Sequence, residues 1–97
     1  MKVVTLCGSM RFANEMMRIA LDLELNHECA VLQCSYNIDN IEINPIKLAK
    51  SHMRKIDMSD AIYVVNINDY IGESVRSEIK YATEAGKEVM YHENRQS

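Results

Sequence analysis

Short apolar runs and longer amphipathic segments alternate along the whole chain. Runs rich in β-branched and other apolar residues are typical of buried strands, and they lie at residues 3–7, 30–32, 61–65 and 87–91. Between them, apolar residues recur every three or four positions, which predicts helices at 11–27, 45–57 and 75–85. A polar tail is expected at 93–97.

Local signals support the ends of the second and third helices. Asn44 followed by Pro45 fits a helix start, because the asparagine side chain can cap the helix and proline suits the first helical position. Ser74 is the predicted N-cap of the third helix, and Gly86 is its predicted stop.

The first two helices are each expected to bury one apolar stripe. In the first helix the stripe and the residues that widen it are Ala13, Met16, Met17, Ala20, Leu23, Phe12, Leu21 and Leu25. In the second helix the stripe consists of Ile46, Ala49, Met53 and Ile56.

The predicted order, β-α-β-α-β-α-β, is typical of a parallel sheet whose strands are joined by crossover helices. We therefore predict a flavodoxin-like or Rossmann-like three-layer α/β/α fold, with a four-stranded parallel sheet in the order 2-1-3-4. In this order the first helix covers one face of the sheet, and the other two helices cover the opposite face. Since 97 residues suffice for one domain, residues 1–97 are predicted to form a single domain.

One helix alone leaves part of a sheet face uncovered. Large exposed apolar patches are uncommon on monomeric proteins. We therefore expect a homodimer, or a higher homo-oligomer, that hides the remaining apolar surface.

Composition and charge mainly exclude certain classes of partner. The net charge is −3 and no long basic run occurs, so duplex nucleic acid is not a predicted partner. No apolar run reaches the roughly 18 residues that a membrane span needs, and the first residues lack the long apolar centre of a signal peptide. A cytoplasmic location without a membrane partner is therefore expected.

The cysteines do not form a recognisable site. Cys7, Cys29 and Cys34 are an odd number in a chain without an export signal, which favours reduced thiols. Cys29 and Cys34 lack C-x-x-C spacing, and adding the histidines gives no familiar zinc-binding set. Neither a metal site nor a cofactor is predicted.

Ligands of open parallel sheets bind outside the carboxyl ends of the strands, where the strand order reverses. Here that point lies between the first and third predicted strands. The loop after the first strand offers Gly8 for close backbone approach, the hydroxyl of Ser9, and the guanidinium of Arg11, which matches phosphate geometry. These three are candidate substrate-binding residues. The alternative is a tight turn with a capping serine and a solvated arginine.

The loop at 66–73 follows the third strand and should lie beside the first loop. Asn66, Asn68, Asp69 and Tyr70 in this loop could contact a sugar or a base. Such residues are also common turn formers, and that alternative stays open.

Glu78 is the main candidate for chemistry. In the predicted third helix it shares one face with Val75, Ile79 and Ala82. A carboxylate on a buried stripe is either a satisfied structural acid or an active-site acid. The helix dipole in the predicted first turn favours its ionised form, which suits a nucleophile.

Two segments of the chain resemble one known superfamily. The first is Cys7-Gly8-Ser9-x-Arg11, and the second runs from Ser59-Asp60-Ala61 through Gly72 to Glu78-Ile79-x-Tyr81-Ala82. In these motifs and in the order of its elements, the chain resembles the nucleoside 2-deoxyribosyltransferase superfamily, which includes the 2′-deoxynucleoside 5′-phosphate N-hydrolases. It resembles most the small bacterial and phage members with a C-G-S-x-R-F start and a K-I-D-x-S-D block.

The resemblance implies roles for several residues. Glu78 matches the glutamate that attacks C1′ of the sugar and displaces the base, and Asp69 lies near an acid that the transferases carry before that glutamate. Ser9 and Arg11 match the 5′-phosphate contacts of the N-hydrolases. Gly72 is assigned to the same substrate-binding set.

Two positions depart from the pattern of the transferases. Leu6 stands where they have a tyrosine, and His52 stands about where they have an aspartate. His52 could donate a proton to the leaving base. Alternatively, it is a helix-face histidine with a backbone partner.

Three functional hypotheses follow. The resemblance implies cleavage of, or transfer from, the N-glycosidic bond of a (deoxy)nucleoside or nucleoside 5′-monophosphate through a glutamate nucleophile. The alternative is a non-catalytic nucleotide-binding module, a sensor or a sponge, that uses the same crevice. The third is an interaction protein whose main feature is its dimer face.

Overall fold

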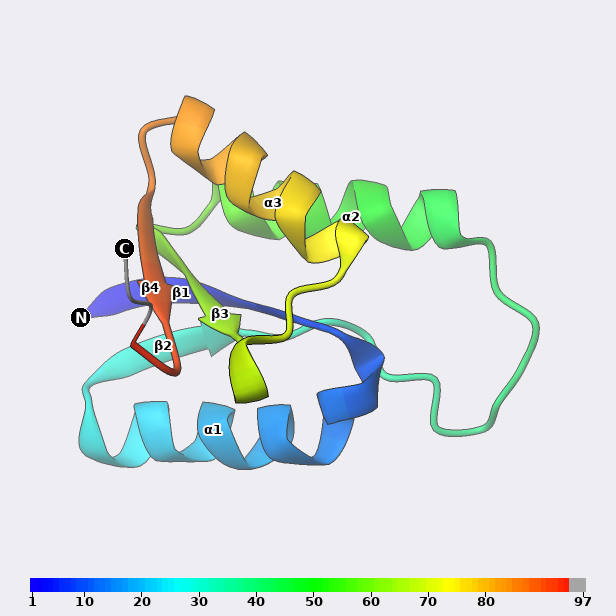
Figure 1. Cartoon of the computed structure of the whole chain (residues 1–97), viewed down its shortest axis with the longest axis horizontal. Coiled ribbons are helices and arrows are strands. Elements are labelled where there is room, and N and C mark those ends of the chain that lie inside the picture. The colour runs from blue at the N-terminus through cyan, green and yellow to red at the C-terminus, as the bar shows by residue number, and fades with distance from the viewer. Residues whose placement is uncertain (95–97) are drawn as a thin grey trace.

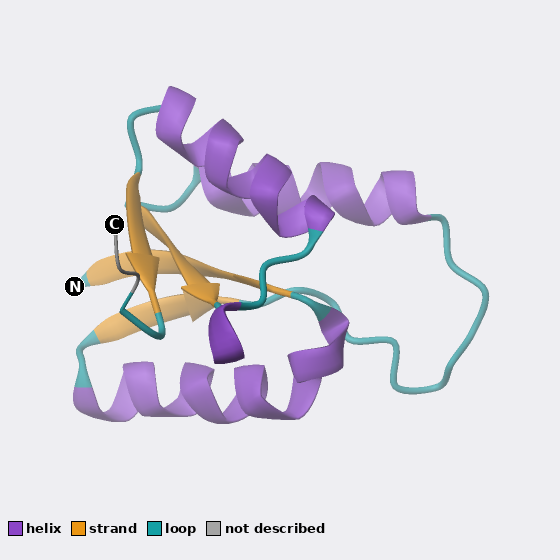
Figure 2. Cartoon of the chain, viewed as in Figure 1, coloured by secondary structure: helices purple, strands orange, loops and turns teal. Residues whose placement is uncertain are grey.

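Strands and helices alternate along residues 1–94, the part of the chain that the computed structural model describes (Figures 1 and 2). Their bounds are β1 (Lys2–Gly8), α1 (Ala13–Asn26), β2 (Cys29–Leu32), α2 (Pro45–Asp57), β3 (Ala61–Val65), α3 (Glu73–Glu84) and β4 (Glu88–Tyr91). Two 3₁₀ turns, Met10–Phe12 and Ile67–Asp69, follow β1 and β3. The last residues of the predicted polar tail, 95–97, lie outside the described residues.

The strands form a parallel sheet in the order β2-β1-β3-β4, as predicted. β1 and β3 are the two central strands, with Val4 opposite Ala61 and Gly8 opposite Val65. α1 covers one face of the sheet, while α2 and α3 cover the opposite face (Figure 1). The predicted flavodoxin-like α/β fold class is confirmed.

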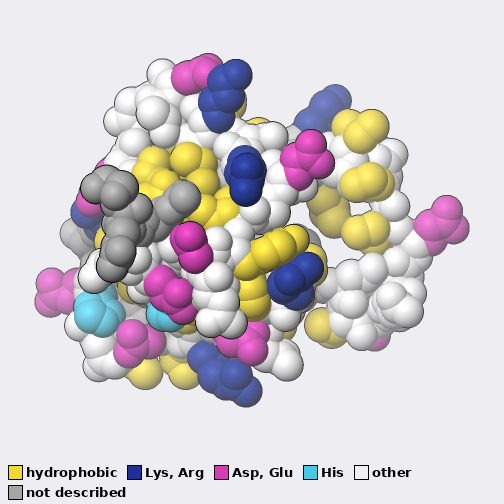
Figure 3. Space-filling view, in the orientation of Figure 1, with side chains coloured by type: hydrophobic (Ala, Val, Ile, Leu, Met, Phe, Trp, Pro, Cys, Tyr) yellow, Lys and Arg dark blue, Asp and Glu magenta, His cyan; other side chains and the backbone are white. Residues whose placement is uncertain are grey.

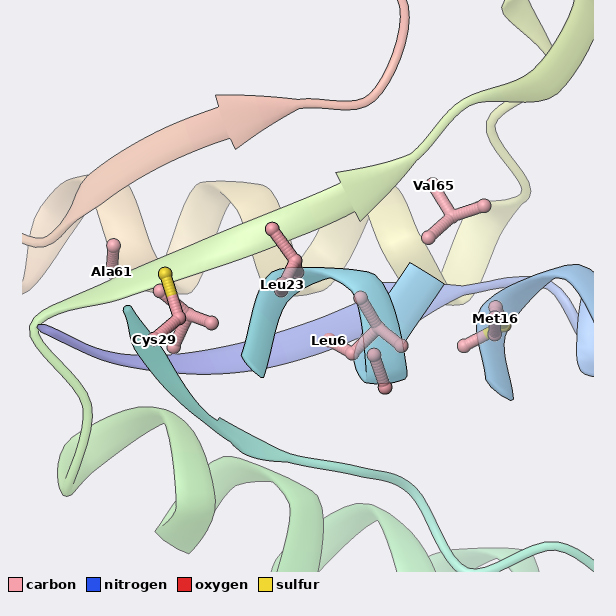
Figure 4. Close-up of a cluster of buried hydrophobic side chains, with 8 residues drawn as sticks. Leu6, Met16, Leu23, Cys29, Ala61 and Val65 are labelled. Carbon is pink, nitrogen blue, oxygen red and sulfur yellow. The ribbon is translucent and has the colours of Figure 1, made fainter. Parts of the chain in front are cut away.

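Each face of the sheet carries its own cluster of buried apolar side chains. The cluster under α1 joins side chains of the strands and the helix, among them Leu6, Met16 and Leu23 (Figure 4). The cluster on the opposite face joins the sheet to α2 and α3, and includes Cys7 and Ile56. Because side chains alternate along a strand, Leu6 and Cys7 face opposite sides. Cys7 therefore faces α2 and α3.

The apolar stripe of α1 is narrower than the sequence predicts. Met16, Ala20 and Leu23 are buried against the sheet. Three residues that were expected to extend this stripe are exposed, namely Met17, Leu21 and Leu25. The helix also begins later than predicted, because a 3₁₀ turn comes first and the Ser9 hydroxyl accepts from the backbone N–H of Arg11 within it.

The predicted start of α2 is confirmed, since Oδ1 of Asn44 accepts a hydrogen bond of 3.0 Å from the N–H of Ile46. Its apolar stripe is buried only toward the C-terminal end. Ile56 is the fully buried residue of this helix, whereas Ile46 is 67% exposed. The prediction of a stripe buried along the whole helix is therefore wrong.

Residues 37–51 form a projecting segment in which every residue is exposed. The segment consists of the later part of the loop before α2 and the first half of α2. This segment extends away from the sheet in Figure 1, and Figure 3 shows hydrophobic side chains gathered along it. They belong to Ile38, Ile41, Ile43, Ile46 and Leu48. The turn within the segment is held by Asn37, whose side chain makes two hydrogen bonds to the backbone of Ile41.

α3 begins at Glu73, directly after Gly72, and not after Ser74 as predicted. Gly72 has extended backbone angles, and its carbonyl already accepts a helical hydrogen bond of 3.0 Å. Gly72, at the N-cap, has no side chain that could cap this helix. The predicted stop is confirmed, because Gly86 adopts a φ of 75°, which glycine reaches without strain.

Asn66 is a structural residue, and the prediction that it contacts substrate is wrong. Its side chain is completely buried. Nδ2 donates to the carbonyl of Glu93 at 3.0 Å, and Oδ1 accepts from the N–H of Glu93 at 2.7 Å. The amide therefore joins the end of β3 to the segment after β4.

Replacing Asn66 by alanine should destabilise the protein by about 1–3 kcal/mol, because the backbone groups of Glu93 lose their partners in a partly buried position. Chemical denaturation measures this change. The control is Asn14→Ala on the exposed face of α1, which should shift the free energy of unfolding by less than about 0.5 kcal/mol. Equal stability of the two variants would contradict the assigned role of Asn66.

Candidate functional site

A pocket of about 520 Å³ lies at the carboxyl end of β1, between α2 and α3. Its volume falls in the range of about 300–1,000 Å³ that is usual for small-molecule sites. The walls come from the loops after β1, β2 and β3, from the projecting segment, and from α2 and α3. This is the edge of the sheet at which the strand order predicts a ligand.

Glu78, His52 and Cys7 meet beside this pocket. Nε2 of His52 lies 3.3 Å from Oε1 of Glu78 and 3.4 Å from Sγ of Cys7. The side chains of His52 and Glu78 are only 12% and 18% exposed, and Cys7 is buried behind them. Three separate elements, β1, α2 and α3, therefore bring one thiol, one imidazole and one carboxylate together.

The surroundings of His52 indicate which of its ring nitrogens carries the proton. Nδ1 is buried and has no hydrogen-bond partner among the described residues. A buried N–H without an acceptor is costly, and Nε2 faces the carboxylate of Glu78. We therefore assign the proton to Nε2, which lies within ion-pair distance of the Glu78 carboxylate and in contact with Sγ of Cys7.

Cys7 is poorly suited to be a nucleophile. Burial raises the pKa of its thiol well above the usual value, and the charge of Glu78 and a hydrogen bond to that carboxylate raise the pKa further. The thiolate is the reactive form of cysteine, so a thiol held neutral does not attack. Glu78 is the group in this cluster that is best placed for nucleophilic chemistry, because its carboxylate also lines the pocket.

The electrostatic argument for Glu78 changes with the helix boundary. Because α3 begins at Glu73, Glu78 lies in the second turn of the helix, and the prediction that it lies in the first turn is wrong. The effect of the helix dipole falls off within the first turn. The polar neighbours of the Glu78 carboxylate are therefore His52 and Cys7 and not the start of the helix.

Three predicted substrate-binding residues, Gly8, Ser9 and Gly72, line the same pocket as Glu78. The first turn of α3 also lines it, including Ser74. Since the N-cap residue Gly72 offers no capping side chain, the N–H groups of the first turn can donate to a ligand. Such N–H groups favour anions, and Ser9 adds a hydroxyl.

Gly8 also has a packing role that explains its presence without a ligand. A Cβ atom at this position would lie 3.0 Å from Sδ of Met16 and 3.1 Å from Cβ of Val65. The glycine therefore permits close contact of β1 with Met16 of α1 and with Val65 of β3.

Arg11 is not among the residues that line the pocket, so its predicted contact with a phosphate stays a prediction. Its guanidinium is stacked on the ring of Tyr70, 3.8 Å from the ring centroid. Tyr70 itself lines the pocket. Arg11 therefore supports a wall of the pocket and lies close to its rim.

Asp69 is not brought to Glu78 either. It lines a separate, smaller hollow with Ile71, Arg76 and Ile79, so the structure does not support its predicted catalytic position. Both Asn68 and Asp69 have positive φ angles, of 56° and 57°. These angles suit asparagine and aspartate in turns, which is the alternative that the sequence left open.

Sequence reasoning missed some residues of the site. The role of Cys7 as a partner of His52 is invisible locally, because 45 positions separate them in the chain. Lys55 lines the pocket, and its ammonium donates to the carbonyl of Gln33. Its place in the K-I-D-x-S-D block was the available signal. Ala49 lines the pocket from α2, although it belongs to the stripe that was predicted to face the core, and Leu48 lines the pocket as well.

Comparison of the chain with protein-family models, with curated proteins and with solved structures gave no match. None of the helices within residues 1–94 has the length and apolar character needed to cross a membrane.

Proposed function

We propose that the pocket binds a nucleoside or a nucleoside 5′-monophosphate and that Glu78 acts on its N-glycosidic bond. The observation that carries the proposal is the environment of Glu78. Its carboxylate lines the pocket, is largely enclosed, and lies 3.3 Å from Nε2 of His52. The resemblance to the nucleoside 2-deoxyribosyltransferase superfamily supports the same role.

In the proposed reaction the carboxylate of Glu78 attacks C1′ of the sugar. The electron pair of the C1′–N bond passes to the base, which takes up a proton and leaves. Water then hydrolyses the ester between Glu78 and the sugar, or the nitrogen of a second base displaces Glu78. The transition state resembles an oxocarbenium ion, which a nearby carboxylate stabilises.

His52 fits a positioning role better than the predicted role of proton donor to the base. Its Nε2 lies beside the attacking carboxylate, at 3.3 Å. A nucleophile approaches C1′ on the face opposite to the leaving base, so a group beside Glu78 is remote from that base. We therefore propose that His52 orients Glu78.

We propose that the phosphate of a nucleotide would lie beside Ser9 and the start of α3. Ser9, Gly72 and the uncapped first turn of α3 line that region together. A hydroxyl and several free N–H groups are suitable phosphate donors. Arg11 lies at the rim and would contribute long-range attraction.

The test is incubation of the protein with a panel of deoxynucleosides, ribonucleosides and their 5′-monophosphates, followed by chromatography for free base. Release of base, or exchange of one base for another, supports the proposal. Intact ligands throughout the panel, at enzyme concentrations sufficient for slow turnover, would refute the catalytic part.

A non-catalytic nucleotide-binding module is the second candidate. It is favoured by the position of Asp69 outside the pocket, because the acid that the resemblance implies near Glu78 is then missing. Stabilisation of the folded protein by a nucleotide that stays intact would support this candidate.

We also propose a homodimer, although through a surface other than the sheet face from which the sequence predicts it. The exposed isoleucines of the projecting segment supply apolar surface that a second copy would cover. A monomer at micromolar concentration in analytical ultracentrifugation would refute this. Within residues 1–94, Cys7, Cys29 and Cys34 are free thiols, which supports the proposal of a cytoplasmic location.

A further inference from the structure

We propose that Cys7, His52 and Glu78 form a binding site for a thiophilic divalent cation, with Zn²⁺ the best match. Sγ, a ring nitrogen and a carboxylate oxygen of these residues all lie within 4.8 Å of one another. No spacing in the sequence indicates this set, because each residue comes from a different element.

The distances fit a tetrahedral zinc ion. With Zn–S near 2.3 Å and Zn–N and Zn–O near 2.0 Å, adjacent ligand atoms of such a site are separated by about 3.3–3.6 Å. The structure has 3.4 Å between Sγ of Cys7 and Nε2 of His52, and 3.3 Å between Nε2 and Oε1 of Glu78. Small side-chain movements therefore suffice to place an ion between them.

The ligand types select among metals. Thiolate and imidazole suit zinc, whereas magnesium and calcium require oxygen ligands. Three protein ligands leave the fourth position open, and the pocket that Glu78 and His52 line provides the path to it. Binding forms a Zn–S bond as the thiol proton leaves to solvent, and the imidazole proton moves from Nε2 to Nδ1.

The surroundings of His52 indicate that the ion binds reversibly. A histidine that binds a metal usually donates its other N–H to an acceptor, and loss of that partner costs about 10–100-fold in metal affinity. Nδ1 of His52 has no such acceptor among the described residues. We therefore expect the ion to bind reversibly. While it is bound, it occupies the carboxylate of Glu78, which the proposed attack on the sugar requires. This competition, unlike the metal binding itself, rests on the proposed function.

The experiment is a titration of the full chain with Co²⁺, a spectroscopic substitute for Zn²⁺, followed by displacement with Zn²⁺. We expect one ion per chain, a thiolate-to-cobalt charge-transfer absorption and the visible bands of tetrahedral cobalt. Cys7→Ala should abolish the charge-transfer absorption. His52→Gln keeps the thiol of Cys7 but removes one proposed ligand. It should weaken cobalt binding by more than about 100-fold, which is the largest loss expected when only a hydrogen-bond partner of a ligand is removed.

Two control variants test the assignment. Cys34→Ser removes the other thiol beside the pocket, and His27→Gln disrupts an exposed histidine–aspartate pair of similar spacing, 3.4 Å. Both should retain the cobalt spectrum. Absence of cobalt binding, or a charge-transfer absorption that Cys34→Ser removes and Cys7→Ala leaves intact, would overturn the site. Circular dichroism of every variant separates lost ligands from lost folding.

The two proposals can fail separately. Metal binding without base release from any nucleotide keeps the metal site and refutes the enzymatic function. Base release without metal binding keeps the enzymatic function and refutes the metal site. If both hold, Zn²⁺ should inhibit base release, and a chelator should restore it.

Discussion

Glu78→Gln is expected to abolish base release while leaving the fold and the pocket intact. Glutamine keeps the length of the side chain and an oxygen that can accept from Nε2 of His52. It has no carboxylate to form the bond to C1′. Removal of a catalytic nucleophile lowers turnover by about 10⁴- to 10⁶-fold. Single-turnover measurements of base release, with a substrate that the panel identifies, check this loss.

Two acids on the same helix are matched controls. Glu84 is exposed on α3 and lies 3.9 Å from Lys80, so Glu84→Gln should leave the rate within about twofold, as expected of a surface substitution. Glu73 lines the pocket in the first turn of α3. If Glu73→Gln removed activity and Glu78→Gln kept it, the nucleophile would be misassigned.

Ile56→Ala should be the most damaging substitution in α2, with a loss of about 2–5 kcal/mol in the free energy of unfolding. Ile56 is the fully buried residue of this helix, and a small domain has only about 5–15 kcal/mol in total. His52 lies one turn earlier on α2, so a loosened helix would also misplace the partner of Glu78. Chemical denaturation and amide hydrogen exchange along α2 measure both effects.

Ile46→Ala is the matched control for this prediction, because it removes the same atoms from the same helix at an exposed position. At a protein concentration low enough to keep the chain monomeric, it should change the free energy of unfolding by less than about 0.5 kcal/mol. A loss as large as that of Ile56→Ala would contradict the exposed position of the first half of α2.

The parts of the fold that local sequence specifies are the parts that were predicted well. The bounds of β3 and α2 agree with the prediction, because an uninterrupted apolar run and an Asn-Pro start are strong local signals. The start of α3 was predicted wrongly, because Ser74 and Gly72 are both acceptable caps. The difference lies in the extended backbone of Gly72 and not in a side-chain signal.

The site was predictable only in part. Strand order places the pocket at the correct edge of the sheet, and Gly8, Ser9, Gly72, His52 and Glu78 all line it. The true partners of some residues depend on packing between distant elements. Asn66 resembles a loop ligand in sequence, and only the position of Glu93 after β4 makes it structural.

The attachment of α2 has a consequence for ligand affinity. This helix is held to the sheet near its C-terminal end, while Leu48 in its first half lines the same pocket as Ser9 and Gly72, which belong to other elements. The distance between these walls is therefore set by the tilt of one helix about its buried end. A ligand that touches both walls must restrain that tilt, and the conformational entropy lost in doing so lowers its affinity. A substitution that stiffens the loop before α2 would recover part of that loss without adding a contact to the ligand.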